Sequence, residues 1–272
     1  MRDVFFTGAT GCLGMLCVRE LSKRGWRIFA SGMNEEKLGK LAELPGVIPI
    51  KADVTDDESL ASAYNTVRTY TDKLDAVVNF AGLSAFASMV EGNPEIIAEK
   101  LLKVNVMGPV RVNRLFFGML LEGKGRIINC SSEAGWLKAQ PFAAPYFMSK
   151  RALEAYSDSL RRELMFLGIP VIKIQPGPFD TSMTAGILED YQSALLSTKY
   201  YLSVLLKLKV FLKSGLQQQC PADRLVSQVI HAMEDRKPKL AYRTGTSKLL
   251  LLLEILPDKL VDSVYMRLVN LV

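Results

Sequence analysis

The chain has 272 residues, of which 49% are hydrophobic and 23% charged, and its formal net charge is +6. This length can bury a full core, and the composition is that of a folded protein rather than a disordered chain. The positive charge is compatible with a membrane surface, a phosphorylated cofactor or a merely soluble surface. The basic residues do not form a stripe with interleaved aromatic residues, so no nucleic acid partner is expected. We predict a single domain, residues 1–272.

Short apolar runs alternate with helical patterns along the chain. The predicted strands lie at residues 4–6, 28–30, 47–50, 76–78, 127–128, 171–174 and 240–242. The predicted helices between strands include residues 35–43, 57–70, 94–121 and 145–167, several of them opened by Asp, Asn or Pro. This alternation predicts an α/β fold with a doubly wound parallel β-sheet flanked by helices.

A glycine-rich turn follows the first predicted strand and opens a predicted helix. Its glycines are Gly8, Gly11 and Gly14. Missing side chains let the backbone approach a pyrophosphate, and the N-terminus of a helix offers free N–H groups to the anion. This context predicts a dinucleotide-binding turn. The alternative is a tight strand-to-helix turn that binds no ligand.

Tyr146 and Lys150 lie four residues apart in a predicted helix, so their side chains share one face. An ammonium beside a phenol favours the phenolate, which would lower the pKa of Tyr146 and suit it to proton transfer near neutral pH. A solvated helix face is the alternative for such a pair in isolation. The other motifs of the chain favour the catalytic interpretation.

The four cysteines and the single histidine show no metal-binding spacing. They are Cys12, Cys17, Cys130, Cys220 and His231. We expect reduced cysteines that serve packing, a solvated or capping histidine, and no metal. Because the first predicted strand begins near the start of the chain, we also expect no export leader and a cytoplasmic protein.

Several motifs together resemble the short-chain dehydrogenase/reductase family, in its single-domain branch and over residues 2–245. They are Asp53-Val54, like the adenine-contacting pair, Asn79-Phe80-Ala81-Gly82, like the Asn-Asn-Ala-Gly element, Asn105-Val106, the pair Tyr146 and Lys150, and the segment from Pro176 to Thr181. The resemblance implies a single-domain Rossmann fold of the hydroxysteroid and retinol dehydrogenase kind. Residues 1–180 would mainly bind the cofactor and catalyse the reaction.

The resemblance further implies hydride transfer between a nicotinamide and a carbonyl or secondary alcohol. Tyr146 would exchange the proton with the substrate oxygen, and Ser132 would hydrogen-bond that oxygen. Lys150 would hold the nicotinamide ribose, and Asn105 would anchor a water that links Lys150 to solvent. Ser132 precedes Tyr146 by 14 positions, one more than is usual in the family, so Ser131 is the alternative. The sequence that follows Ser132, Glu-Ala-Gly, favours Ser132.

The resemblance also assigns residues to the cofactor. They are Gly8, Thr10, Gly11, Cys12, Leu13, Gly14, Gly32, Met33, Asn34, Asp53, Val54, Asn79, Ala81, Gly82, Tyr146, Lys150, Pro176, Gly177, Phe179 and Thr181. Gly32 stands where NAD-specific members carry an acidic side chain, and Met33 offers no cation to a 2′-phosphate. Because Ser31, Asn34 and Lys37 are available as donors, we predict that NADP(H) is modestly preferred over NAD(H).

The glycine spacing departs from the single-domain pattern. Members of that branch usually carry the middle glycine where Cys12 stands, whereas Gly8, Gly11 and Gly14 have the spacing of the longer-chain branch. This difference in glycine spacing affects the part of the turn that would contact the cofactor phosphates.

Residues 182–215, here called the lid segment, are rich in Leu, Tyr and Val, and the resemblance places them over the substrate. An apolar lid favours a lipophilic substrate such as a hydroxysteroid, a retinoid or a long-chain ketone. The predicted substrate contacts are Ser84, Phe86, Ala134, Phe142, Met183, Leu188 and Tyr191. The alternative is that the apolar residues of the lid segment are the core faces of two amphipathic helices. Reduction of 3-oxoacyl or other short-chain ketones, and nucleotide binding by a non-catalytic regulator, are the competing functions.

Residues 246–272 are rich in Leu and Val, but charged residues interrupt the apolar runs, which are too short to span a bilayer. They predict C-terminal helices that pack over the substrate mouth, form an oligomer contact or lie peripherally on a membrane. We expect a homodimer or homotetramer.

Overall fold

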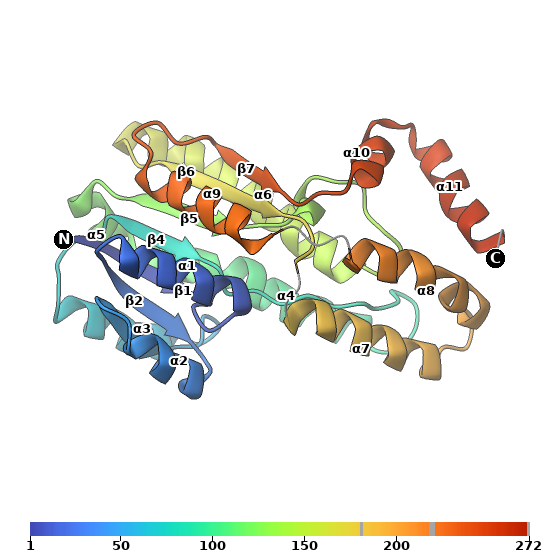
Figure 1. The fold of residues 1–272 in the computed structure, drawn as a ribbon, viewed down its shortest axis with the longest axis horizontal. Helices are drawn as coiled ribbons and strands as arrows, with labels where there is room; N and C mark the ends of the chain where they lie inside the picture. Colours follow the sequence, from blue (N-terminus) through green and yellow to red (C-terminus); the bar gives the residue numbers. More distant parts are fainter. Residues whose placement is uncertain (180–181, 218–220, 271–272) are drawn as a thin grey trace.

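The computed structural model describes residues 1–179, 182–217 and 221–270. Within these residues, parallel strands form one sheet in the order β3-β2-β1-β4-β5-β6-β7 (Figure 1). The strands are β1 (Arg2–Thr7), β2 (Trp26–Gly32), β3 (Val47–Lys51), β4 (Ala76–Asn79), β5 (Arg126–Cys130), β6 (Val171–Pro176) and β7 (Ala241–Thr244). The predicted doubly wound α/β fold is confirmed.

Helices cover both faces of the sheet (Figure 1). They are α1 (Cys12–Lys23), α2 (Glu35–Ala42), α3 (Asp57–Arg68), α4 (Pro94–Leu102), α5 (Gly108–Gly123), α6 (Ala144–Leu164), α7 (Ser182–Ser197), α8 (Leu202–Gln217), α9 (Ala222–Glu234), α10 (Lys248–Ile255) and α11 (Asp258–Asn270). The apolar faces of α1, α2 and α9 pack on one side, and those of α3, α5 and α6 pack on the other. On the second face, the ring centroids of Phe5 and Phe116 stack 4.1 Å apart.

The order of the strands reverses between β1 and β4, and the helices that follow these two strands pack on opposite faces of the sheet. Such a switch point is where doubly wound sheets bind ligands. Thr7, at the end of β1, joins the two loops, because its hydroxyl accepts from the N–H groups of Phe80 at 3.2 Å and Ala81 at 3.3 Å. The glycine turn and the loop after β4 therefore meet at one point.

The helix predicted over residues 94–121 is interrupted. A π-helical turn, η1 (Lys103–Met107), separates α4 from α5. It turns the buried side chain of Asn105 towards the loop after β4, where Asn105 hydrogen-bonds to Leu83. Such bulges are often found at functional sites. The predicted helix at 145–167 also ends earlier, at Leu164, and a 3₁₀ turn (Met165–Leu167) leads to Gly168, whose φ of 71° ends the segment.

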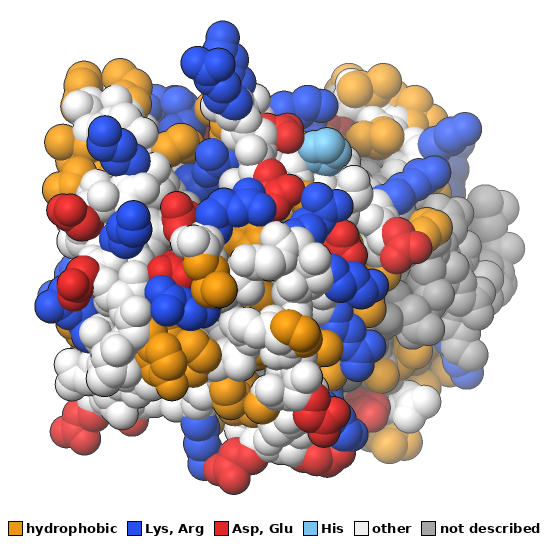
Figure 2. Space-filling model, turned by 60° about the vertical axis from the view of Figure 1, so that its left-hand side comes forward, with side chains coloured by type: hydrophobic (Ala, Val, Ile, Leu, Met, Phe, Trp, Pro, Cys, Tyr) orange, Lys and Arg blue, Asp and Glu red, His pale blue; other side chains and the backbone are white. Residues whose placement is uncertain are grey.

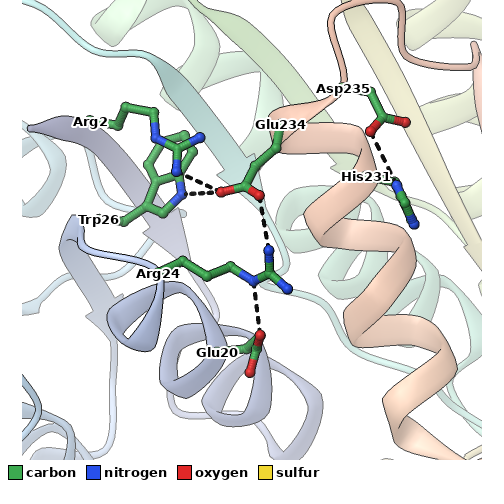
Figure 3. A network of polar contacts seen from close by, with 7 residues as sticks. All are labelled: Arg2, Glu20, Arg24, Trp26, His231, Glu234 and Asp235. Carbon is green, nitrogen blue, oxygen red and sulfur yellow. Dashed lines mark hydrogen bonds and ion pairs between the residues drawn. The ribbon is translucent and has the colours of Figure 1, made fainter.

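Glu234, at the C-terminal end of α9, ties this helix to the first two strands and to α1 (Figure 3). Its carboxylate accepts from Arg2 at 2.7 Å, from the indole N–H of Trp26 at 3.0 Å and from Arg24 at 3.1 Å. Arg24 also donates to Glu20 at 2.8 Å. These contacts hold the C-terminal end of α9 close to β1, β2 and the end of α1.

The single histidine lies at the surface, and the described cysteines form no disulfide with one another. His231 is exposed and faces Asp235 at 3.1 Å (Figure 3), in keeping with the predicted solvated role. Cys17 and Cys130 are thiols, and burial raises the pKa of Cys130 to about 11, so it stays protonated and unreactive at neutral pH. Cys220 lies outside the described residues.

Charges of both signs share the face that Figure 2 shows, where Lys and Arg side chains intermingle with Asp and Glu. At the opposite end, α7, α8, α10 and α11 extend beyond the carboxyl ends of the strands (Figure 1). No helix in the described part of the chain combines the length and apolarity needed to cross a bilayer.

Candidate active site

A cavity of about 1080 Å³ opens at the carboxyl ends of the strands, beside the switch point. This volume is at the upper end of the range for small-molecule sites. Its wall is formed by the loops that follow β1, β2, β3, β4, β5 and β6, together with the start of α6 and the inner face of α7.

The glycine turn lines this cavity, and its backbone packs closely against neighbouring backbone atoms. Gly8 has a φ of +68°, and a Cβ there would lie 2.5 Å from the amide nitrogen of Ala81. A Cβ on Gly14 would lie 2.2 Å from the carbonyl oxygen of Gly8. Gly11 caps α1, whose first residue Cys12 lines the cavity with Leu13. The turn thus presents the N-terminus of a 12-residue helix to the cavity, and these residues fit a dinucleotide pyrophosphate.

The predicted adenosine contacts lie together at one end of the cavity. Gly32, Met33, Asn34, Asp53 and Val54 all line it. A Cβ at Gly32 would lie 2.5 Å from the hydroxyl oxygen of Thr10, so any other residue there would require the Thr10 side chain to move. Asn34 caps α2 by accepting from the backbone N–H of Lys37 at 2.9 Å, and both residues reach the cavity.

Tyr146 lies in the first turn of α6, and its buried hydroxyl is hydrogen-bonded to Ser132, which follows β5. The predicted lowering of the Tyr146 pKa is wrong for this structure. Burial raises that pKa, and the Ser132 hydrogen bond only opposes the rise. The ammonium of Lys150 donates to the carbonyl oxygen of Cys130 at 3.0 Å and lies 5.8 Å from the centre of the Tyr146 ring. Burial also lowers the pKa of Lys150.

The two adjacent serines have different surroundings. The Ser132 hydroxyl accepts from the N–H of Ala134 at 3.2 Å and faces Tyr146. The Ser131 hydroxyl is buried without a partner among the described residues, and it lies 2.6 Å from the position of a Cβ on Gly135. Ser132, rather than Ser131, is therefore placed to contact the oxygen that Tyr146 would protonate.

Asn105 connects two walls of the site. Its side-chain oxygen accepts from the N–H of Leu83 at 2.7 Å, and its amide donates to the Leu83 carbonyl at 2.8 Å and to the Ser149 hydroxyl at 2.9 Å. The side chain thus fixes the loop after β4 to α6, one residue before Lys150. The predicted water-anchoring role stays a prediction.

Asn79 does not reach the cavity. Its side-chain amide is buried and donates to Asn113 at 2.8 Å and to Asn129 at 2.9 Å. It therefore links β4 to β5 and α5, whereas the neighbouring Ala81 and Gly82 line the cavity as predicted. Pro176, Gly177 and Phe179 line it as well, and Thr181 lies outside the described residues.

The predicted substrate contacts divide into two groups. Ser84, Phe86, Ala134 and Met183 line the cavity, whereas Phe142, Leu188 and Tyr191 do not. Phe142 and Tyr191 instead pack behind Phe86, with ring centroids 5.4 Å and 5.6 Å from it. Phe142 and Tyr191 therefore pack against a residue of the cavity wall and do not line the cavity themselves.

Some residues of the lid segment pack α7 against α8, and others line the cavity. Tyr191, Leu205 and Leu208 are buried, and the Tyr191 hydroxyl donates to the Leu205 carbonyl at 2.8 Å, so these residues hold α7 against α8. Other apolar residues of the segment, Ile187 and Leu212 among them, line the cavity.

A family profile described as short chain dehydrogenase matches residues 2–192. The chain belongs to the short-chain dehydrogenase family. It is an oxidoreductase that acts on an alcohol or ketone.

Relatives and structural neighbours of this dehydrogenase agree with the assignment. Retinol dehydrogenase 16 of Rattus norvegicus is 31% identical over 96% of this chain and 87% of the relative. Human 17-beta-hydroxysteroid dehydrogenase type 6 is 32% identical over 66% of this chain and 58% of the relative. The fold is similar to that of a Burkholderia phymatum short chain dehydrogenase/reductase in complex with NAD, with a TM-score of 0.77 at 19% identity over 96% of this chain and 94% of the other.

The dehydrogenase also places acidic groups at the cavity that sequence reasoning missed. Glu133 lines it directly after Ser132, and Asp190 of α7 accepts from the backbone N–H of Phe86 at 3.1 Å. The signal in the sequence that could have identified Glu133 as a cavity residue was its position directly after Ser132. Its burial depends on β6 and the loop after β7, which no local pattern places beside it.

Proposed function

We propose that this dehydrogenase interconverts a secondary alcohol and a ketone on a lipophilic, hydroxysteroid-like substrate, using NADP(H) in modest preference to NAD(H). The hydrogen-bonded pair of Tyr146 and Ser132 within a partly apolar cavity carries the proposal. The names of the relatives, retinol dehydrogenase and hydroxysteroid dehydrogenase, support the lipophilic class.

The protein residues would hold and protonate the substrate oxygen. When bound, the nicotinamide cofactor supplies or accepts the hydride. Tyr146 would donate its proton to the carbonyl oxygen during reduction, and Ser132 would hydrogen-bond the same oxygen as charge develops on it. Lys150, held by Cys130 at 3.0 Å, would bind the nicotinamide ribose. Asn105 would keep the loop after β4 and α6 at the right separation.

Activity should rise with the apolar size of the ketone. Phe86, Met183, Ile187 and Leu212 line the cavity, and each buried CH₂ of a substrate contributes up to ~0.8 kcal/mol of binding. We expect kcat/KM to increase along a panel from short aliphatic ketones through retinoids to steroids, followed by nicotinamide absorbance. A preference for short 3-oxoacyl substrates would favour the competing ketone reductase function, and no turnover with any substrate would favour a non-catalytic regulator.

The cofactor preference follows from the end of β2. Gly32 places no carboxylate there, so nothing at this position repels a 2′-phosphate. Lys37 lines the cavity at the start of α2 and can approach the phosphate. We expect kcat/KM for NADP(H) to exceed that for NAD(H) by a few fold, and Lys37→Ala to reduce this ratio. A tenfold preference for NAD(H), about 1.4 kcal/mol, would refute the assignment.

Peripheral membrane contact through the C-terminal helices also belongs to the proposal. Several large apolar side chains of α10 and α11 are exposed: Leu249, Leu251, Leu252, Ile255, Leu260 and Met266. Exposed Lys248, Lys259 and Arg267 lie on the same helices and would attract anionic lipid headgroups. A homodimer or homotetramer stays a prediction from the sequence.

Vesicle binding tests this contact. The protein should co-sediment with vesicles of phosphatidylcholine and phosphatidylserine, and the double substitution Leu251→Asp and Leu252→Asp should reduce binding several-fold. Phe166→Asp is the matched control, because Phe166 is 80% exposed but belongs to the 3₁₀ turn that follows α6 rather than to these helices. Equal binding by all three proteins would remove the membrane assignment.

A further inference from the structure

Glu133 places an acidic group at the centre of the site. It begins the 3₁₀ turn η2 (Glu133–Gly135), directly after Ser132, and lines the cavity. Its Oε2 atom is fully buried and has no hydrogen-bond partner among the described residues. Burial raises the pKa of this carboxyl to about 7, and the neighbouring Thr246 hydroxyl opposes the rise. The group therefore changes charge within the physiological pH range.

The carboxyl lies against the segment after β6. A Cβ on Gly177 would lie 2.8 Å from Oε2 of Glu133, so the side chain contacts the backbone of that segment. The pKa of Tyr146 is raised mainly by burial and to a smaller extent by the charge of Glu133, so the two groups interact electrostatically. The carboxyl thus contacts the wall formed by Pro176, Gly177 and Pro178 and interacts electrostatically with the residue that would protonate the substrate.

Three cations on the elements around Glu133, Lys150, Lys173 and Arg243, are engaged by other groups. On α6, Lys150 donates to Cys130, and Glu154 pairs with Lys173 of β6 at 2.8 Å. On β7, Arg243 donates to Gln175 at 2.9 Å and lies 4.0 Å from the centre of the Trp136 ring. Neither Lys150, Lys173 nor Arg243 forms an ion pair with Glu133. A positive charge that entered the cavity here would find a carboxylate that forms no ion pair with the described residues.

The nicotinamide ring of the cofactor carries such a positive charge in its oxidised state. The proposed function requires the ring to lie within reach of Tyr146 and Lys150, along the wall that Gly177 forms. The oxidised ring is a cation and the reduced ring is neutral. In a site with little water, a carboxylate stabilises a nearby cation far more than it does in bulk solvent.

We propose that Glu133 selects the oxidation state of the bound nicotinamide. As a carboxylate it favours the oxidised, cationic ring, and as a neutral acid it loses that preference. This inference rests on the proposed function, because it assumes that a nicotinamide cofactor occupies the cavity. Rising pH then shifts the enzyme towards binding the cofactor form that oxidises alcohols.

The sign of the pH dependence follows from linkage. Binding of the cationic ring favours the ionised carboxyl and lowers its pKa below the value of about 7 in the free protein. Oxidised cofactor should therefore bind with proton release just below neutral pH. A shift of one pKa unit corresponds to a tenfold change in affinity. The ratio of the dissociation constants, reduced over oxidised, should rise about tenfold between pH 5.5 and 8.5 and level off above the free-state pKa.

The test measures binding without turnover. Dissociation constants for NADP⁺ and NADPH are determined by calorimetry from pH 5.5 to 8.5, and their ratio cancels the contributions of the phosphates and riboses that both forms share. Glu133→Gln should make the ratio independent of pH and about tenfold lower at pH 8.5. Glu189→Gln is the matched control, because Glu189 also lines the cavity but lies on α7, and it should behave as the parent.

Three further results decide the inference. Glu133→Asp should retain a pH-dependent ratio, which separates the loss of charge from a general disturbance of the turn. A ratio that is flat in the parent protein, or unchanged by Glu133→Gln, would overturn the selection of oxidation state while leaving the proposed function intact. Failure to bind either cofactor would instead overturn the proposed function and the inference with it.

Discussion

Replacing Tyr146 with Phe is expected to lower kcat by about 10²–10⁴-fold, because the substitution keeps the ring and removes the hydroxyl that exchanges the proton. Burial raises the pKa of this phenol, so it is protonated at neutral pH and ready to donate to a ketone oxygen. Cofactor affinity should change little, since Lys150 and the glycine turn are untouched. Steady-state kinetics with the best ketone, together with cofactor titration, measure both quantities.

A second tyrosine on the same helix provides the control. The Tyr156 hydroxyl accepts from Asn113 at 3.1 Å, and Tyr156 does not line the cavity. Tyr156→Phe removes an equivalent hydroxyl and should keep kcat within about twofold of the parent. Turnover by Tyr146→Phe at a similar level would show that another group moves the proton.

Local patterns were sufficient for the architecture. The alternation of apolar runs and helical segments depends on neighbouring residues, and each predicted strand overlaps a strand of the structure. The glycine turn was predictable for the same reason, since strand, glycines and helix are contiguous from Val4 to Lys23. The predicted cofactor residues within the described part of the chain line the cavity, with the exception of Asn79.

Contacts between distant segments account for the differences. In the π-helical turn, Asn105 hydrogen-bonds to Leu83, which is 22 positions away in the sequence. Asn79 is held by Asn113 and Asn129 rather than placed at the cavity. The pattern of residues within a single helix or strand cannot predict which distant residues will form such hydrogen bonds.

Burial also reversed an electrostatic expectation. The spacing of Tyr146 and Lys150 correctly places both on one helix face, but the spacing says nothing about the water that surrounds them. In the folded chain both groups are buried, and desolvation penalises the phenolate and the ammonium alike. The same effect makes Glu133 a group that titrates near neutral pH, although its neighbours in the sequence are unremarkable for charge.

Substitution of the adjacent serines should give opposite results. Successive residues of an extended segment point to opposite sides, so only one of the two hydroxyls can face the substrate oxygen. Ser132→Ala removes the hydroxyl that contacts Tyr146 and would stabilise the developing oxyanion, and we expect kcat to fall by about 10²–10³-fold. Ser131→Ala removes a buried hydroxyl without a described hydrogen-bond partner, and kcat should stay within about twofold while thermal stability is retained. Kinetics and melting curves of the two purified variants distinguish the assignments. The reverse order of effects would place Ser131 at the substrate oxygen.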